Sequence, residues 1–292
     1  MKETVPQIKF SNKRKESQFD FICLEELYAR KELTHTLFDF QQIDFYMLLF
    51  FTDGQGIHTI DFTDYTYHKG TILSIRKDQI HKFFKSSAKG YLLLFTEDFL
   101  FQFFNHSEVL KSLQLFNELI TSPKIELDKN AYATFIKIID EIGHEYFDIQ
   151  DEYSLGTIRS LMHILFSKIL RIKSKDNQIL EGKKYLAEFT HFQVLVEQQC
   201  LKTKKVADYA DQMAVSTKTL NNITQRIVHK PAKTFIDEIV MTQIKRLLIN
   251  TKLTVKEIAY ESGFQEPTNL YKFFKKHTDV SPEVFRQTYQ IG

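Results

Sequence analysis

One pattern that occurs twice near the C-terminus constrains the fold of this chain more than any other feature. Between about Lys202 and Gly292, apolar residues of a first copy recur in a second copy at a nearly constant spacing. The spacing is 49 residues before a turn and 50 after it: Val206 matches Val255 and Ala210 matches Ala259, then Leu220 matches Leu270, Ala232 matches Pro282 and Phe235 matches Phe285. The repeat predicts two copies of one small helical unit, with a turn one residue longer in the second copy.

The second copy has the residues of two short helices joined by a tight turn. Thr254 can cap the first helix, and Glu257 three residues later completes a capping box. Gly263 lies where the turn needs a residue without a Cβ atom. Pro267 suits the first turn of the next helix, because its missing N–H group costs nothing there. These features predict a helix-turn-helix unit.

On the second helix of this copy, apolar and polar residues separate onto two faces. Residues at i, i+3 and i+4 form an apolar stripe that must pack on the first helix: Leu270, Phe273 and Phe274. The opposite face is basic and rich in hydrogen-bonding groups: Thr268, Tyr271, Lys272, Lys275 and Lys276. We therefore expect this second face to be the outer one.

The first copy repeats this plan with different residues. Ser216 can cap its second helix. The inner face has Leu220, Ile223 and Ile227, and the outer face has Lys218, Asn221 and Asn222. A single connecting helix is predicted over Ala232–Asn250, long enough at ~1.5 Å per residue to hold the two units apart. A rigid pair spaced near one DNA turn, ~34 Å, can enter two successive major grooves.

The residues of the second copy closely resemble those of the AraC/XylS family of bacterial transcription regulators. The resemblance depends on Ile258, Ala259, Gly263, Phe264, Leu270, Phe274, Lys275, Lys276, Pro282, Phe285 and Arg286. In that family each copy presents a recognition helix to the major groove of DNA. The resemblance implies DNA contacts from Pro267, Thr268, Tyr271 and Lys272 in the second copy, and from Lys218, Asn221 and Asn222 in the first.

The chain departs from the family pattern at several positions. The arginine that is common near Asn222 and Lys272 is absent, and Thr224 stands where the first copy often has an aromatic residue. His229 and Asp279 occupy positions where the family prefers glycine. Both are expected helix C-caps, because His and Asp are among the residues that tolerate a left-handed backbone.

The overall charge of +2 hides a difference between the two parts of the chain. Residues 183–292 contain 17 Lys and Arg against 11 Asp and Glu, a balance of +6. Residues 1–182 contain 22 against 26, a balance of −4, and the two balances add to +2. Taken alone, such a split fits ordinary solvated surfaces equally well. Because it coincides with the helix-turn-helix pair, it is the footprint expected of a phosphate-binding half.

Cysteine usage and hydropathy indicate the compartment. Cys23 and Cys200 lie in different predicted domains, which argues against a disulfide scaffold and suits a reducing environment. The N-terminus is polar, without an apolar segment of signal-peptide length. The apolar run Phe45–Phe51 is far shorter than the ~20 residues needed to cross a bilayer. We therefore expect a cytoplasmic protein with no membrane partner.

Residues 19–95 alternate short aromatic and β-branched runs with turn residues such as Gly54 and Gly70. Strands are predicted at Phe19–Leu27, Leu33–Phe40, Phe45–Phe51, Gly56–Ile60, Thr71–Ile75 and Tyr91–Phe95. Many short strands at this spacing predict a small antiparallel barrel or jelly roll. The segment 70–81 also resembles the degenerate second motif of a cupin barrel, the usual N-terminal partner in AraC-type regulators. The predicted fold class is α+β, with an antiparallel cupin-like β-barrel and helices followed by an all-α domain.

From Thr96 the pattern becomes helical. Helices are predicted at Glu97–Phe104, Ser107–Leu119, Asn130–Phe147 and Leu155–Lys173. The last has a continuous apolar stripe of Leu155, Ile158, Met162, Leu165, Ile169 and Ile172, which fits either an intramolecular seam or a dimer interface. The family resemblance favours the dimer. We expect a sensor and dimerisation domain over 1–173, a linker over 174–182 and a DNA-binding domain over 183–292.

A small barrel can hold one small molecule, and five residues are candidates for the lining of such a pocket. They are Phe38, Phe40, Tyr46, Tyr67 and His81, although aromatic residues in such strands are more often plain core. The metal-binding cupin signature needs two histidines at alternate positions of one strand, and no His-x-His occurs in this sequence. No nucleophile has a recognisable catalytic context either. We therefore expect no enzyme activity, no metal and no cofactor.

The sequence thus predicts a sequence-specific DNA-binding transcriptional regulator of the AraC/XylS type. Its predicted partners are double-stranded DNA and a second copy of the chain, with a small-molecule effector and RNA polymerase as further candidates. Guanine or phosphate contacts are expected from Lys218 and Lys272, adenine contacts from Asn221 or Asn222, and phosphate contacts from Lys275 and Lys276. The alternatives are a metal-dependent cupin enzyme fused to a helical interaction module, and a helix-turn-helix fold that binds only protein.

Overall fold

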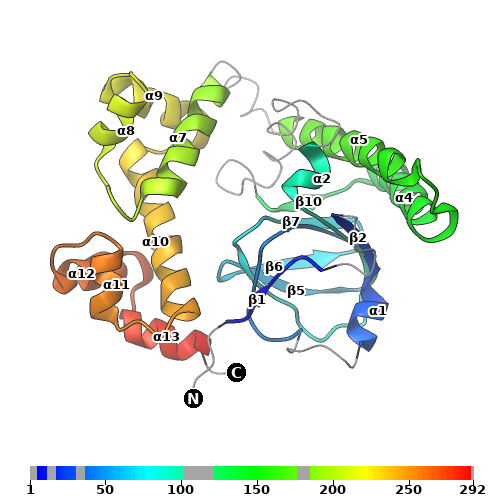
Figure 1. The fold of residues 1–292 in the computed structure, drawn as a ribbon, viewed down its shortest axis with the longest axis horizontal. Coiled ribbons are helices and arrows are strands. Elements are labelled where there is room, and N and C mark those ends of the chain that lie inside the picture. Colours follow the sequence, from blue (N-terminus) through cyan, green and yellow to red (C-terminus); the bar gives the residue numbers. More distant parts are fainter. Residues whose placement is uncertain (1–4, 12–17, 31–36, 102–121, 176–184, 291–292) are drawn as a thin grey trace. The chain divides into compact units, whose positions relative to one another are not determined.

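The computed structural model describes residues 5–11, 18–30, 37–101, 122–175 and 185–290. The chain divides into two compact units (Figure 1). One comprises Pro6–Lys175, and the other comprises Asp176–Gly292 together with Met1–Val5. No helix in the described ranges combines the length and the apolar character that crossing a membrane requires.

Ten strands in the described part of the first unit form two five-stranded sheets. One sheet has the order β1-β3-β8-β5-β6, and the other has the order β10-β7-β4-β9-β2. Their bounds are β1 Gln7–Ile8, β2 Phe19–Cys23, β3 Gln41–Ile43, β4 Tyr46–Asp53, β5 Gln55–Ile60, β6 Thr63–His68, β7 Thr71–Ile75, β8 Ile80–Lys82, β9 Lys89–Phe95 and β10 Lys124–Glu126. All recorded strand pairs are antiparallel except β1 with β3, which is parallel.

The central strand β4 is buried on both faces, because it separates two apolar clusters. Tyr46, Leu48 and Phe50 contribute to a cluster that the helices cover. The intervening residues, Met47, Leu49 and Phe51, contribute to a second cluster between the sheets. Side chains alternate along a strand, so a strand with apolar residues at every position packs on both sides. This architecture confirms the predicted α+β class with an N-terminal cupin-like sheet domain.

The helices of this unit are α1 Leu24–Ala29, α2 Glu97–Phe101, α4 Lys129–His144, the π-helical turn η2 Glu145–Ile149, and α5 Ser154–Lys175. Helix α4 begins at a capped position, where the Asp128 carboxylate accepts a hydrogen bond from the Ala131 amide at 2.8 Å. Helix α5 continues through Lys175, into the segment predicted as a linker. The rest of that segment lies outside the described residues.

The apolar stripe of α5 is an intramolecular seam. Four of its members, Ile158, Met162, Leu165 and Ile169, are fully buried in the cluster that includes the outer face of β4 and β9. The interpretation of this stripe as a dimer interface is therefore wrong. The outer face of that sheet is apolar and must be covered, and α5 supplies the cover within the same chain.

Several predicted elements of this unit differ from the structure. The strand predicted over Phe19–Leu27 ends at Cys23, where α1 follows directly. Within the predicted strand Leu33–Phe40, residues 37–40 form a turn and 31–36 lie outside the described part, as does the predicted helix Ser107–Leu119. Five further strands were not predicted from the sequence: β1, β3, β6, β8 and β10. Four of these have only two or three residues, and β6 is mostly polar, so apolar periodicity does not reveal them.

The second unit is helical throughout its described part. Its helices are α7 Leu186–Gln199, α8 Val206–Gln212, α9 Thr217–Val228, α10 Ala232–Asn250, α11 Val255–Glu261, α12 Pro267–Thr278 and α13 Pro282–Gln290. Figure 1 shows α10 running between a group formed by α7, α8 and α9 and a group formed by α11, α12 and α13. The bounds of α10 confirm the predicted connecting helix. Aromatic rings join α7 to α10, with Phe189 and Phe235 at a centroid distance of 5.0 Å.

Candidate DNA-binding surface and barrel cavity

The turns of the two helix-turn-helix units have the same backbone hydrogen bonds. Three amide-to-carbonyl bonds in the first turn correspond to three in the second at an offset of 49. They run from Met213 to Tyr209, Ala214 to Asp211 and Val215 to Ala210, and from Ser262 to Ile258, Gly263 to Tyr260 and Phe264 to Ala259. The next matched position, the N-cap of the second helix, is Ser216 in one copy and Glu266 in the other, an offset of 50. The predicted repeat and its longer second turn are thus confirmed.

The predicted caps are also present. The Ser216 hydroxyl accepts a hydrogen bond from the Thr219 amide at 3.0 Å, and Thr254 forms a complete capping box with Glu257. Both recognition helices, α9 and α12, end at a residue with a left-handed backbone. These residues are His229 with φ of 54° and Asp279 with φ of 59°, as predicted.

The two recognition helices expose the basic faces that the sequence predicts. On α9, Lys218 and Asn222 are exposed; on α12, Thr268, Tyr271, Lys272, Lys275 and Lys276 are exposed, and Pro267 is half-buried at the first helical position. Among the described residues, none pairs its carboxylate with Lys218, Lys272, Lys275 or Lys276. By contrast, Lys230 forms an ion pair with Glu238 at 2.6 Å. The four unpaired ammonium groups leave positive charge on both helices available to an anionic partner.

Asn221 does not face outward as predicted. Its Oδ1 accepts a hydrogen bond from the Ala232 amide at 3.0 Å, and its Nδ2 donates to the Thr217 carbonyl at 2.9 Å. The first of these bonds satisfies an otherwise unpaired N–H group at the start of α10. The side chain of Asn221 therefore joins α9 to α10, and Asn222 is the asparagine of this helix that is exposed.

Tyr271 occupies the equivalent position on α12 and also bonds to the following helix. Its hydroxyl donates to the Glu283 carboxylate at the start of α13. This hydrogen bond, together with some desolvation, raises the pKa of Tyr271. The ring remains more than a third exposed, so Tyr271 combines a structural bond with an accessible aromatic face.

Arg286 on α13 anchors the second helix-turn-helix unit to the C-terminal end of α10. Its Nε donates to the Leu248 carbonyl at 2.8 Å, and one of its terminal nitrogens donates to the Leu253 carbonyl at 2.7 Å. Burial lowers the pKa of this guanidinium. Sequence reasoning placed Arg286 in the family pattern without giving it a role, because its two acceptors lie more than 30 residues away.

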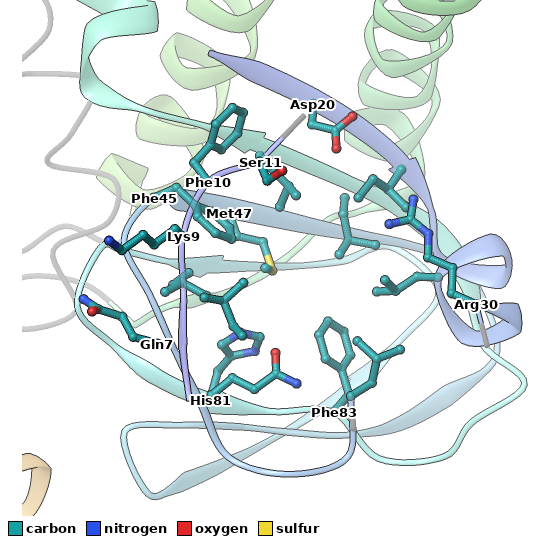
Figure 2. Close-up of a pocket in the computed structure, with 18 residues that line it drawn as sticks. Gln7, Lys9, Phe10, Ser11, Asp20, Arg30, Phe45, Met47, His81 and Phe83 are labelled. Atoms are coloured by element: carbon teal, nitrogen blue, oxygen red, sulfur yellow. The ribbon is translucent and has the colours of Figure 1, made fainter. Parts of the chain in front are cut away.

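The N-terminal compact unit, Pro6–Lys175, contains a cavity of about 450 Å³ between its two sheets (Figure 2). Most of its walls are apolar, and its lining residues are Gln7, Ile8, Lys9, Phe10, Ser11, Asp20, Ile22, Leu27, Arg30, Leu37, Gln41, Ile43, Phe45, Met47, His81, Phe83, Leu92 and Leu94. Figure 2 shows His81 and Phe83 pointing into the cavity, whereas the Lys9 ammonium points away from it. His81 is the one predicted ligand residue that contributes to this lining.

The other four predicted ligand residues lie elsewhere. Tyr46 points to the helix-covered side of β4, where its hydroxyl donates to Glu97 at 2.8 Å. Tyr67 is buried against Phe51, with ring centroids 3.7 Å apart. Phe38 stacks on Tyr28 and Phe40 packs beside Phe62 and Lys82. None of these four residues lines the cavity. Tyr46 faces the helix-covered side of its strand, which composition alone does not reveal, whereas Tyr67 and Phe38 pack in the cluster between the sheets without reaching the cavity.

His81 is paired with His58 in the interior. Its Nδ1 lies 3.3 Å from the Nε2 of His58, and both rings are almost fully buried. Burial, reinforced by His81, lowers the pKa of His58 well below its usual value. In the described part of the chain no three His, Cys, Asp or Glu side chains gather in a way that could hold a metal ion.

Comparisons with known proteins agree with this arrangement. A domain described as AraC-like ligand binding domain matches residues 25–171, and a helix-turn-helix domain matches residues 209–288. A relative described as histidine kinase P4 from Formosa agariphila is 26% identical over 127 residues, which are 44% of this chain and 9% of that protein. The matched region therefore spans only a small part of that relative.

Solved structures of similar chains include ToxT from Vibrio cholerae with a bound unsaturated fatty acid. That chain is 16% identical, with 92% of this chain and 91% of that chain covered and a TM-score of 0.42. The DNA-binding domain of AdpA in complex with target DNA is 20% identical, with 35% and 91% covered and a TM-score of 0.33. These TM-scores are low, so the assignment depends on the domain matches. Since the ligand-binding match alone spans half of the chain, this chain belongs to the AraC/XylS family of transcription regulators.

Proposed function

We propose that the protein is a sequence-specific DNA-binding transcription regulator that reads DNA with α9 and α12. The observation that carries this proposal is the pair of exposed faces whose lysines, Lys218 and Lys272 among them, have no ion-pair partner in the described residues. The 19-residue α10 is about 28 Å long at ~1.5 Å per residue. That length supports entry of the two helices into successive major grooves, which lie ~34 Å apart along the duplex.

Different roles follow from position and chemistry. Lys218 and Lys272 are placed to contact guanine or phosphate, and Asn222 is the candidate for an adenine contact. Lys275 and Lys276, near the end of α12, would contact phosphates and contribute affinity without sequence preference. Pro267, Thr268 and Tyr271 complete the contacts proposed for the second unit. Asn221 is left out of this group, since both ends of its amide bond to backbone atoms.

We also propose that the barrel cavity binds a small-molecule effector. Its volume of about 450 Å³ and largely apolar walls suit one small apolar molecule, with His81, Gln41 and Arg30 as polar contacts. An acidic or hydrogen-bond-accepting group on that molecule would match these residues. The fatty acid bound to ToxT is an example of such chemistry in another protein of known structure.

We propose that the protein acts in the cytoplasm, without catalytic activity of its own, and contacts a second copy and RNA polymerase at its promoter sites. The dimer cannot depend on the buried stripe of α5, because that stripe already contributes to the core. Sedimentation of the full chain with and without DNA would measure the oligomeric state.

The decisive test is selection of full-length protein on random and genomic DNA across a salt series, followed by sequencing of the retained fragments. We expect one bipartite motif, with the logarithm of affinity falling steeply as the logarithm of salt concentration rises. A variant with both Lys218→Ala and Lys272→Ala should lose the motif while remaining folded. If the parent protein binds no DNA even at low salt, the proposed function is wrong.

A further inference from the structure

The short segment between α7 and α8 contacts the turn of the other helix-turn-helix unit. Leu201 lies beside Gly263, and a Cβ atom built on Gly263 would lie only 2.3 Å from the Leu201 carbonyl oxygen. Backbones therefore touch at this point, with no room for a side chain. The contact joins the entrance of the first unit to the turn between α11 and α12.

Lys204 strengthens this contact with two interactions. Its ammonium donates a hydrogen bond to the Ser262 carbonyl and lies 4.4 Å from the centroid of the Phe264 ring. Ser262 is the C-cap of α11, where helix carbonyl groups lack partners within the helix and a positive charge is favourable. A charge-assisted hydrogen bond and a cation–π contact thus act on adjacent sides of one turn.

One end of this connection is attached to α8, and the other is attached to the recognition helix α12. On one side, the Tyr209 hydroxyl of α8 donates to the Thr203 carbonyl at 2.8 Å, which ties the Lys204 segment to the first unit. On the other side, Phe264 packs on Phe273 of α12 at a centroid distance of 5.6 Å. Helix α8 packs on α9. The contacts of Lys204 and Phe264 therefore link α8 to α12 without passing through α10.

We propose that Lys204 is a positioning residue that fixes the orientation of α9 relative to α12 and so limits DNA binding to sites of one spacing. This inference rests on the proposed function. Helices of both units pack on α10, and Asn221 and Arg286 bond to its two ends. The attachment at Ser262 and Phe264 adds a direct link between the units that does not pass through α10, so DNA with altered spacing can bind both helices only if this link breaks.

The test compares Lys204→Met with Lys205→Met in the full chain. Lys205 is the adjacent, exposed lysine, so its loss removes the same charge without the contact. The DNA probes are the selected bipartite site, the same site with ~5 base pairs inserted between its halves (about half a turn), and one half alone. Lys204→Met should lose about tenfold affinity for the selected site, as expected for a charge-assisted hydrogen bond, and keep its affinity for the single half.

The preference for one spacing between the two half-sites is the measurement that a purely structural role of Lys204 would leave unchanged. Lys204→Met should discriminate less between the selected and the lengthened site, Lys204→Arg should restore part of the discrimination, and Lys205→Met should keep all of it. If Lys204→Met discriminates as strongly as the parent, or loses affinity equally for the single half, the inference is overturned.

A measurement without DNA separates this inference from the proposed function. Hydrogen exchange of the Ser262, Gly263 and Phe264 amides should become faster in Lys204→Met, while the amides of α10 remain unchanged. If exchange becomes faster in Lys204→Met but the parent protein selects no DNA motif, the attachment is supported and the proposed regulator function is refuted. Unchanged exchange would refute the attachment. Lys204→Gln, which keeps a donor without the charge, serves if Lys204→Met does not fold.

Discussion

The two helix-turn-helix units have one backbone plan but stabilise its turn differently. Each turn has a residue in the left-handed region, Ala214 with φ of 52° and Gly263 with φ of 69°. Alanine costs roughly 1–2 kcal/mol in that region, whereas glycine enters it freely. The second turn has an additional demand, because the Leu201 carbonyl occupies the space of a side chain. The difference shows that Gly263 is required by packing as well as by backbone conformation, and that Ala214 meets the backbone requirement alone.

A second difference concerns equivalent positions on the recognition helices. Asn221 and Tyr271, which are 50 residues apart, both bond to the first turn of the following helix. Asn221 uses an amide oxygen and a backbone N–H, whereas Tyr271 uses a hydroxyl and the carboxylate of Glu283. The conserved feature between the copies is thus a connection to the next helix, and its chemistry differs. In the proposed complex with DNA, base contacts from the first copy would come from neighbours such as Asn222.

Substitutions in the two turns should have the largest expected effect, a change in the free energy of unfolding. Gly263→Ala should lower the free energy of unfolding by about 3 kcal/mol, the combined cost of a left-handed alanine and an overpacked contact. Ala214→Gly should change it by less than about 1 kcal/mol, because relief of strain opposes the greater freedom of the unfolded chain. Urea unfolding followed by circular dichroism measures both. Equal effects at the two turns would contradict the comparison.

Two exposed lysines of α12, Lys272 and Lys276, should contribute to DNA binding in different ways. Lys272→Ala is expected to weaken binding of the selected site by ~1–3 kcal/mol and to relax the preference at one base pair. Lys276→Ala should weaken all sites alike and reduce the salt slope by about 1. Competition binding against single-base variants of the site distinguishes the two. An unchanged preference with a reduced salt slope would make Lys272 a phosphate contact instead.

Substitution of Asn221 should mainly lower stability, whereas substitution of Asn222 should mainly lower DNA affinity. Asn221→Ala leaves the Ala232 amide without its acceptor and should cost about 1–2 kcal/mol of stability. Asn222→Ala should cost less than ~0.5 kcal/mol of stability, as an exposed substitution does, and should lower DNA affinity. The matched measurement is thermal unfolding together with DNA titration of both variants. If Asn222→Ala were the more destabilising, the assignment of roles would be reversed.

The smallest expected effect is the part of the pH dependence of the unfolding free energy that comes from Tyr271 in the second helix-turn-helix unit. The bond to Glu283 raises the folded pKa of Tyr271, so its contribution to stability is complete below the unfolded pKa, about 10, and is lost as the pH rises through the folded pKa. Tyr271→Phe should make the alkaline loss of stability smaller by the contribution of Tyr271, whereas Asn221→Ala should leave the alkaline loss as in the parent. Unfolding in urea at neutral and alkaline pH measures the difference, and identical pH profiles of parent and Tyr271→Phe would refute it.

Sequence reasoning succeeded where the chemistry is local. The caps at Ser216 and Thr254, the left-handed positions at His229 and Asp279, and the bounds of α10 all depend on residues a few positions apart. It failed for the barrel pocket, where one candidate of five, His81, contributes to the cavity. A strand such as β4 is apolar on both faces, so its sequence does not indicate whether Tyr46 or Met47 faces the cavity.

The sequence by itself determined the repeat, the helix ends and the separation of charge, because caps, turn residues and helical periodicity act within one or two turns of chain. Only the tertiary structure decided that the stripe of α5 covers a sheet, that Asn221 bonds to α10, and that Lys204 reaches Ser262. The partners in this last bond are 58 residues apart. Contacts of this kind depend on how separate helices pack, and the free energy of that packing has no signature in any short segment of the chain.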